Sequence, residues 1–329
     1  MADSLTILRA RGRRLAKLVK PGGALEGYDS ARTVDLHHRD VSDLAALHRL
    51  LGNLSARPDC CIVRGAIRDP HRVRRVRRLL HDDKATGEAA TLRDVPRHWL
   101  GLDLDGIDLP ASTAPADLAG CAAAAVARLP DAFTGAACIV QATASHGIKP
   151  GARLRLWFWC DRALSGAECK RWLAAAPVDR SVFGAAQPLY TAAPVFPAGL
   201  ADHLPARILL LPGRETVATP SVAALASPPR RPASPPRAAT GSRYALAALT
   251  RAAAQIATAP EGGRHDTAKA AAWGLARLVR AGLLSEAEVK QTIGNAIAAA
   301  GKDSAEGEAI AAWAIAHRRD GAVPEGVRR

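Results

Sequence analysis

The chain has 329 residues, of which 48% are hydrophobic, and its 45 Lys and Arg against 31 Asp and Glu give a formal net charge of +14. This length accommodates two domains, and no apolar run reaches the roughly 18 residues of a membrane-spanning helix, so we expect no membrane segment. The positive charge favours a polyanionic partner, most simply nucleic acid, although an alanine- and arginine-rich chain can also reflect a GC-rich genome.

The cysteines and the N-terminal segment bear on the compartment in which the protein acts. The six cysteines form no Cys-x-x-Cys pair and lack the spacing of a zinc site, so we expect buried free thiols in a reducing cytoplasm. Residues 7–17 are basic and mildly amphipathic, but they lack the apolar stretch of a secretory signal. We therefore predict a basic N-terminal arm and a cytoplasmic protein.

Helix and strand patterns intermingle before residue 217. Apolar residues at helical spacing predict helices over residues 40–54, 70–80 and 116–129. Apolar or alternating runs predict strands over residues 60–63, 99–104, 137–143 and 153–160. Ser165 and Glu168 then form a capping-box pattern, which predicts the start of a further helix. Together these elements predict an α+β domain with a central sheet flanked by helices.

The helix predicted over residues 70–80 is strongly basic. Its apolar residues fall on one side, and five arginines occupy the rest of its surface. Such a face suits a nucleic-acid backbone, and Arg72, Arg75 and Arg78 are the candidate DNA contacts. A solvated basic face is the alternative interpretation.

A proline-rich segment divides the chain in two. Between residues 217 and 242, six prolines stand among Ala, Ser and Arg without an apolar periodicity. Proline at this density excludes a helix or a central strand, so we predict a semi-extended linker. The domains on either side are then residues 1–216 and residues 243–329.

The second domain is predicted to be a small all-α bundle. Apolar spacing predicts helices over residues 244–256, 267–281, 286–300 and 305–318. Capping boxes and helix-terminal glycines support these boundaries at Ser285 with Glu288, Asp303 with Glu306, Gly282 and Gly301. Trp273 and Trp313 are predicted to anchor the core of this bundle.

One stretch of the second domain resembles a phosphate-binding loop. It runs from Gly294 to Gly301 and Lys302, but its spacer is too long and Asp303 stands where a Ser or Thr is required. We therefore find no ATPase signature in the chain.

The segment over residues 99–107, Trp-Leu-Gly-Leu-Asp-Leu-Asp-Gly-Ile, places two acids in a predicted strand. Because side chains alternate along a strand, Asp103 and Asp105 point to the same face. Two neighbouring carboxylates repel each other, and a divalent cation with a preference for oxygen ligands relieves that repulsion. A solvent-facing acidic pair at a strand end is the alternative interpretation.

Cationic side chains follow this acidic pair. The strand predicted over residues 137–143 leads into Ser145, His146 and Gly147, where a histidine beside small residues can approach a bound phosphate. A structural histidine is the alternative. Lys149 follows, and Arg153 and Arg155 share one face of the next strand. A third carboxylate, Asp179, comes after the capped helix.

In this order, the motifs resemble those of the archaeo-eukaryotic primase superfamily. That family is known by an Asp-x-Asp strand, a Ser-x-His element, and a later single acid preceded by an apolar residue. The matching residues here are Asp103 and Asp105, the Ser145-His146 region, and Val178-Asp179. Residues 61–65 and 96–100 look like the lead-in of plasmid- and phage-borne members, and residues 263–324 look like the helical domain that follows their core.

Two departures from the family pattern affect individual residues. Ser145 and His146 are adjacent, so Ala144 fills the first position of a literal Ser-x-His motif. The stretch after Asp179 also differs from the corresponding segment of many plasmid primases. Asp161 and Asp202 are therefore alternatives for the third acid.

The resemblance implies a DNA primase or primase-polymerase, which joins ribo- or deoxynucleoside triphosphates on a single-stranded DNA template with two divalent metal ions, Mg²⁺ or Mn²⁺. It implies that the metal-binding and catalytic residues are Asp103, Asp105 and Asp179. It implies that the nucleotide-binding residues are Ser145, His146, Lys149, Arg153 and Arg155. Replication of a plasmid, phage or integrated element is the expected setting, with unwinding by a separate replicative helicase.

Two other functions remain open from the sequence. A non-catalytic replication initiator would bind DNA through its basic surface without affinity for triphosphates. A metal-dependent nuclease would use the same three carboxylates for hydrolysis, although the cations near His146 suit a triphosphate better.

Overall fold

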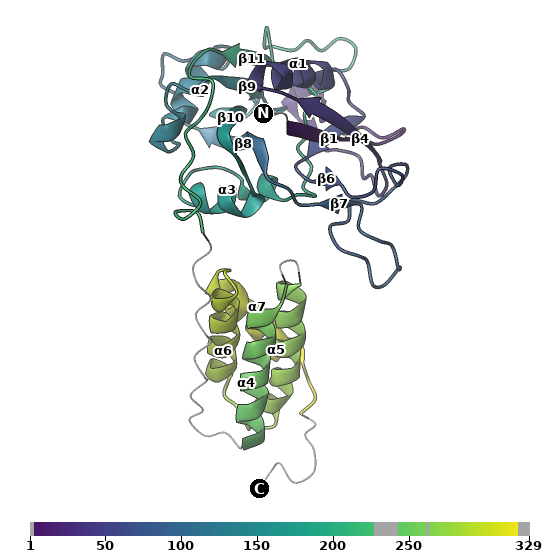
Figure 1. The fold of residues 1–329 in the computed structure, drawn as a ribbon, viewed down its shortest axis with the longest axis vertical. Helices are drawn as coiled ribbons and strands as arrows, with labels where there is room; N and C mark the ends of the chain where they lie inside the picture. The colour runs from purple at the N-terminus through teal and green to yellow at the C-terminus, as the bar shows by residue number, and fades with distance from the viewer. Residues whose placement is uncertain (1–2, 227–242, 261–262, 322–329) are drawn as a thin grey trace. The chain divides into compact units, whose positions relative to one another are not determined.

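The computed structural model describes residues 3–226, 243–260 and 263–321, and it divides the chain into two compact units, Met1–Leu225 and Ala226–Arg329 (Figure 1). The first unit mixes helices with antiparallel sheets, and the second is helical, so the predicted α+β class with a C-terminal helical region is confirmed. Within the described ranges, every helix is too short or too polar to cross a bilayer.

One antiparallel sheet of the first unit has the strand order β4-β1-β5, from β1 (Asp3–Arg9), β4 (Asp35–Val41) and β5 (Cys60–Val63). The predicted basic N-terminal arm is therefore wrong, because residues 7–9 lie in the central strand, where Ile7 and Leu8 are buried. Nearby carboxylates pair with the basic residues of this segment. Arg9 lies 2.7 Å from Asp59, and Arg11 lies 2.6 Å from Asp35.

The second sheet carries the acidic pair and has the strand order β11-β9-β10-β8. Its strands, all antiparallel to their neighbours, are β8 (Arg97–Ile107), β9 (Cys138–Ala142), β10 (Ala152–Leu164) and β11 (Ile208–Leu211). Strand β10 alternates as predicted, but both of its faces are buried, Leu156 and Phe158 on one and Trp157 and Trp159 on the other. The sheet therefore lies inside the core of the unit, and β8 is hydrogen-bonded to the largely buried strand β10.

Three helices pack around these sheets. They are α1 (Leu44–Ser55), which contacts strands of both sheets, α2 (Leu118–Val126) and α3 (Gly166–Trp172). Helix α1 begins later than predicted because Asp43 caps it by accepting a hydrogen bond from the Ala46 amide, while residues 40 and 41 belong to β4. The capping box of Ser165 and Glu168 at the start of α3 is confirmed. Two-stranded ribbons complete the unit: β2 (Leu18–Val19) with β3 (Leu25–Glu26), and β6 (Ala66–Ile67) with β7 (Leu92–Arg93).

The helix predicted over residues 70–80 is wrong. This segment instead lies along β4, because the amide of Val76 donates to the carbonyl of Val34 and the amide of Leu36 donates to the carbonyl of Val73. Arg75 has a φ of 52°, which no helix tolerates. The apolar spacing that mimics a helix serves here to bury Val76 and half-bury Val73 under an edge of the first sheet.

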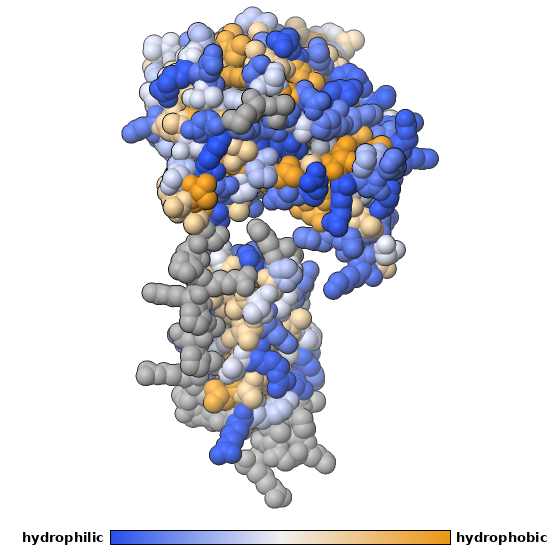
Figure 2. All heavy atoms as spheres, in the orientation of Figure 1, coloured by the Kyte–Doolittle hydropathy of each residue, from blue (hydrophilic) through white to orange (hydrophobic). Residues whose placement is uncertain are grey.

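All six cysteines lie in the first unit, and each is a buried free thiol, as predicted. Burial raises the pKa of Cys60 and Cys138 to about 11 and that of Cys61 to about 12. Hydrophilic residues dominate the face of this unit that Figure 2 shows, with apolar residues in scattered patches.

The first unit extends beyond the boundary predicted at residue 216. Val217 is buried, and its amide donates to the carbonyl of Trp159. Leu225 is also buried, and its carbonyl accepts a hydrogen bond from Arg171. The predicted linker thus begins too early, and its residues 227–242 lie outside the described residues.

The second unit contains α4 (Arg243–Thr258), α5 (Arg264–Arg280), α6 (Glu286–Ala299) and α7 (Ser304–His317). The capping box at Ser285 is confirmed, and Gly282 and Gly301 have φ values of 72° and 83° beyond helix ends. Asp303 caps α7, but the capping box predicted for Asp303 and Glu306 does not form. The Glu306 carboxylate pairs with His265 and Lys302 instead.

Small and aliphatic side chains fill the core of the second unit, among them Leu249, Ile256 and Ile293. Trp273 and Trp313 are 38% and 42% exposed, so the prediction that they anchor this core is wrong. Alanine and branched aliphatic side chains occupy the core positions instead.

Candidate functional site

The acidic pair lies on β8, an edge strand of the four-stranded sheet. Asp103 and Asp105 both line a cavity of about 80 Å³, which places them on one face of the strand. Their side chains differ in exposure, at 22% for Asp103 and 65% for Asp105. The shared face follows from the two-residue repeat of a strand, as the sequence predicted.

Two arginines on the neighbouring strand pair with these acids. In the register of β10 against β8, Arg155 lies opposite Asp103 and Arg153 lies opposite Asp105. Arg155 Nη2 is 2.8 Å from Asp103 Oδ2, and Arg153 Nη1 is 3.1 Å from Asp105 Oδ1. Arg155 also donates to the carbonyl of Tyr190 and is only 8% exposed, so it is a fixed part of the cavity wall.

Asp103 keeps one carboxylate oxygen without a protein partner. Its Oδ1 is buried and accepts no hydrogen bond from any described residue. Such an oxygen is costly to leave in place unless a cation or water satisfies it. With Asp105 beside it in the same cavity, this oxygen suits a single hard divalent cation such as Mg²⁺ or Mn²⁺.

Asp179 lies next to the acidic pair but serves as a helix cap. Its amide donates to the Asp103 carbonyl over 3.0 Å, so the segment runs along the free edge of β8. The Asp179 carboxylate accepts from the amide and hydroxyl of Ser181, where it caps the 3₁₀ helix η3 (Arg180–Phe183). Within the described ranges, no three His, Cys, Asp or Glu side chains are grouped to hold a metal. The predicted three-carboxylate centre is therefore incomplete.

Neither alternative for the third acid reaches this cavity. Asp161 accepts hydrogen bonds from the amide and hydroxyl of Thr219. Asp202 forms an ion pair with Arg207 and lines a different cavity. Of the three candidates for the third acid, Asp179 is the one with a hydrogen bond to the backbone of Asp103.

His146 is buried, and both of its ring nitrogens are in use. Nε2 lies 2.8 Å from the carbonyl of Pro115, while Nδ1 accepts the amide of Arg153 over 3.1 Å. Burial lowers the pKa of the imidazole, which agrees with a neutral ring held between two backbone groups. The histidine therefore fixes the turn before β10, and in this arrangement it offers no nitrogen to a phosphate.

The other predicted nucleotide ligands divide between two surfaces. Ser145 lines the cavity of Asp103, and Lys149 is exposed on the same turn but does not line it. His146 instead borders a second cavity of about 380 Å³, whose lining includes Lys20, Asp202 and Arg207. The two cavities thus border neighbouring residues of one turn, Ser145 for the acidic cavity and His146 for the second.

Three residues that the sequence analysis missed also line the acidic cavity: Lys17, Tyr28 and Tyr190. The two tyrosine rings stack with centroids 3.5 Å apart, and the Lys17 ammonium lies 5.6 Å from the Tyr28 ring. Burial raises the pKa of Tyr28 to about 12, so its hydroxyl stays protonated at neutral pH. The only sequence signal for Lys17 is its place in a basic run.

The arginines predicted to contact DNA do not share a helix face. Arg72 is exposed, the Arg75 amide donates to Asp35, and Arg78 donates to the carbonyl of Ala186. Burial opposes ionisation of Asp35, but hydrogen bonds from the Arg75 amide and from Arg11 outweigh it and lower the pKa. Asp35 thus holds the basic segment against β4.

Comparisons of the chain with protein-family models, with curated proteins and with solved structures found no match. The geometry of the cavity and the order of the sequence motifs therefore carry the functional argument.

Proposed function

We propose that the protein is a DNA primase or primase-polymerase that joins nucleoside triphosphates on a single-stranded DNA template. The observation that carries the proposal is the arrangement around Asp103, whose buried Oδ1 lacks a protein donor among the described residues. Asp105, Lys17 and Arg155 line the same cavity, so carboxylate oxygens and cationic groups face one small space. Such a donor set suits a divalent cation together with a phosphate group.

Asp103 and Asp105 would hold Mg²⁺ or Mn²⁺, which when bound activates a primer hydroxyl and neutralises a triphosphate. Arg155 orients Asp103 through one Nη and is itself anchored to Tyr190 through the other. Lys17 lies where it can donate to a phosphate oxygen beside the acids. Asp179 would become a further ligand only if it gave up its two bonds to Ser181.

The incoming nucleotide needs more room than the acidic cavity offers. Small-molecule sites span about 300–1,000 Å³, whereas this cavity has a volume of about 80 Å³. The second cavity, which is lined by His146 and has a volume of about 380 Å³, has the required size. Lys20 and Arg207 line it, but Lys20 already pairs with Glu26 and Arg207 with Asp202, so a nucleotide would compete with these acids for the two cations. We assign the base and sugar to this second cavity and the phosphates to the turn at Ser145.

One observation favours a second candidate, a non-catalytic DNA-binding replication initiator. Both acids of β8 form ion pairs with arginines, and the third acid caps a short helix, so each has a structural role without a cation. In that case the net charge of +14 would serve DNA binding alone.

The two functions, and nuclease activity as a third, are separated by one assay. The protein is incubated with a single-stranded DNA template, labelled nucleotides and Mn²⁺. We expect labelled products that grow with time, and we expect Asp103→Ala combined with Asp105→Ala to abolish them. Asp40→Ala is the control, because this acid of β4 is 82% exposed and lies outside the cavity lining.

Other outcomes of this assay would reject the proposal. Template binding without incorporation would favour the initiator, and shortening of the template would indicate a nuclease. Incorporation that persists in the double variant would show that the acidic pair is not the catalytic centre.

A further inference from the structure

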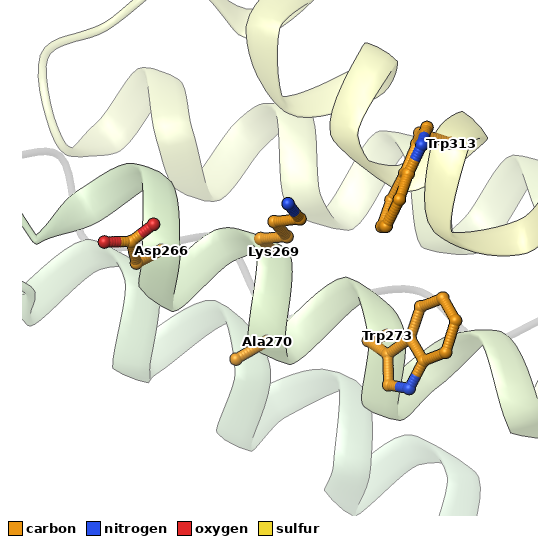
Figure 3. A pocket seen from close by; sticks show the side chains of 5 residues that line it. All are labelled: Asp266, Lys269, Ala270, Trp273 and Trp313. Carbon is orange, nitrogen blue, oxygen red and sulfur yellow. The ribbon is translucent and has the colours of Figure 1, made fainter. Parts of the chain in front are cut away.

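The helical unit carries two neighbouring tryptophans on its surface (Figure 3). Trp273 projects from α5 and Trp313 from α7, and their ring centroids are 5.8 Å apart with the ring planes inclined by 35°. A cavity of about 360 Å³ lies beside them, lined also by Asp266, Lys269 and Ala270. Large aromatic side chains are usually more buried than these two, so an exposed adjacent pair is a candidate for an interaction surface.

Cationic groups accompany both rings. The Lys269 ammonium lies 4.8 Å from the Trp313 centroid, and the Arg318 guanidinium lies 5.4 Å from the Trp273 centroid. Arg318 is fixed by an ion pair with Asp320 and by a hydrogen bond to the carbonyl of Trp273. Lys269 forms no ion pair with a described residue, but its ammonium lies over Trp313, and His317 stacks on the same ring with the centroids 4.9 Å apart. A base that stacks on Trp313 therefore has to displace one of these two side chains, and the long, flexible lysine is the easier of the two to move. Asp266 lines the same cavity and, in Figure 3, lies at the far end of the row from the indoles.

We propose that this surface, the tryptophan patch of Lys269, Trp273, Trp313 and Arg318, binds single-stranded DNA. Bases of an unpaired strand expose flat faces that stack on indole rings, and stacking of this kind tolerates any sequence. The ammonium of Lys269 then contacts a backbone phosphate beside the stacked base. Duplex DNA hides its base faces, so the patch selects the unpaired form.

The local charge that favours a polyanionic occupant over a peptide comes from Lys269, because Asp320 pairs with Arg318 and Asp266 lies at the far end of the cavity. Of the net charge of +14, the described residues of the helical unit contribute only +3, from 10 Lys and Arg against 7 Asp and Glu. An apolar helix as occupant would have to cover an unpaired ammonium, which is unfavourable. The choice of DNA as the polymer that binds the tryptophan patch rests on the proposed function. The stacking and charge arguments do not depend on it.

Binding of a fluorescent oligothymidine to the full-length chain tests this inference. We expect Trp313→Ala and Trp273→Ala each to weaken binding about tenfold, the effect of losing one base–aromatic stack. Lys269→Ala should weaken binding and reduce its dependence on salt. Leu246→Ala on α4 is the matched control, since Leu246 is exposed to the same 38% as Trp273 and lies outside the patch.

A second probe isolates the stacking contribution. An abasic oligomer of equal length keeps the phosphates but lacks the bases, so it should bind the unmodified chain more weakly than oligothymidine does. The two probes should bind the Trp273→Ala/Trp313→Ala double variant alike. Circular dichroism checks that the variants keep their helices, and Trp313→Phe should retain part of the affinity.

Several results would overturn the inference. One is an unchanged affinity in the double variant, and another is equal binding of the abasic oligomer to the unmodified chain. A third is a change in oligomeric state without a change in DNA affinity, which would make the patch a self-association surface. Nucleotide incorporation is measured in parallel. Incorporation with tryptophan-independent binding rejects this inference alone, whereas tryptophan-dependent binding without incorporation rejects the proposed function alone.

Discussion

Arg155 is the residue on which the geometry of Asp103 depends. We expect Arg155→Met to lower the free energy of unfolding by about 2–3 kcal/mol, because it leaves a mostly buried carboxylate without a partner. Asp103→Asn combined with Arg155→Met should recover much of this loss by removing both charges. If the cavity binds a cation, Mn²⁺ should stabilise the Arg155→Met variant through linkage, and EDTA should reverse that effect.

Urea unfolding with and without Mn²⁺ measures these differences. Arg153→Met is the matched control, since its partner Asp105 is 65% exposed and pairs of that kind contribute about 0–1 kcal/mol. A loss as large for Arg153→Met as for Arg155→Met would contradict the special position of Asp103. Absence of any Mn²⁺ effect would argue against a cation in this cavity.

His146 makes the stability of the first unit dependent on pH. Burial lowers its pKa from the ordinary 6.5, so the unfolded chain takes up a proton more readily than the folded chain. The stability from the neutral ring is therefore complete above about pH 6.5 and is lost as the pH falls below it. His146→Gln should flatten the decline in unfolding free energy between about pH 7.5 and pH 5.5.

His37 contributes to the same decline in unfolding free energy at low pH, so its contribution has to be measured separately from that of His146. Burial, followed by the charge of Arg39, lowers its pKa as well. The variant His37→Gln measures that share, and the two effects should add, because the residues lie in different parts of the unit. A slope identical in His146→Gln and the unmodified chain would show that the imidazole is not buried as a neutral ring.

For individual residues, the sequence predicted the face of the strand on which they lie but not the residues with which they pair. The two-residue repeat of a strand sufficed to place Asp103 and Asp105 on one face. The partners of these acids could not be read in advance, because the register between β8 and β10 is set by packing and by the intervening chain. For the same reason the sequence did not predict that Arg153 pairs with Asp105 and Arg155 with Asp103 across the strands.

At the scale of elements, the contact between α6 and α7 is set by glycine. A Cβ on Gly307 would lie 2.7 Å from the carbonyl oxygen of Ile293 and 2.8 Å from the Cα of Gly294. We expect Gly307→Ala to force the helices apart and to lower the stability of the helical unit by about 1–3 kcal/mol.

Gly274→Ala on α5 provides the control for this prediction. A Cβ at Gly274 meets no atom within 4 Å, so alanine should stabilise the unit by up to about 1 kcal/mol through its higher helix propensity. Thermal unfolding followed by circular dichroism measures both changes. Equal effects of the two substitutions would show that helix propensity, and not the close contact, governs stability at Gly307.

Elements with strong local signals were predicted well, and elements defined by distant partners were not. Ser165 and Ser285 form the capping boxes that their spacing indicated. The segment around Val73 and Val76 has the spacing of a helix, but pairing with β4 overrides it. The exposure of Trp313 was not predicted, because apolar periodicity does not distinguish a core position from a partly exposed one.

At the scale of the whole molecule, the division into two units followed from the change of pattern around the proline-rich segment. The first unit is built on sheets and the second is helical, and each has a hydrophobic core of its own. The boundary was set too early because Val217 carries no signal of its pairing with Trp159, which lies far away in the sequence.

The distribution of cysteine has a practical consequence at this scale. All six thiols lie between residues 60 and 169, each is buried, and the helical unit contains none. Alkylating reagents attack the thiolate, which burial and the raised pKa values suppress while the first unit is closed. The rate at which the thiols of the native chain are alkylated therefore measures how often the sheet-containing unit opens. The measurement needs no introduced label.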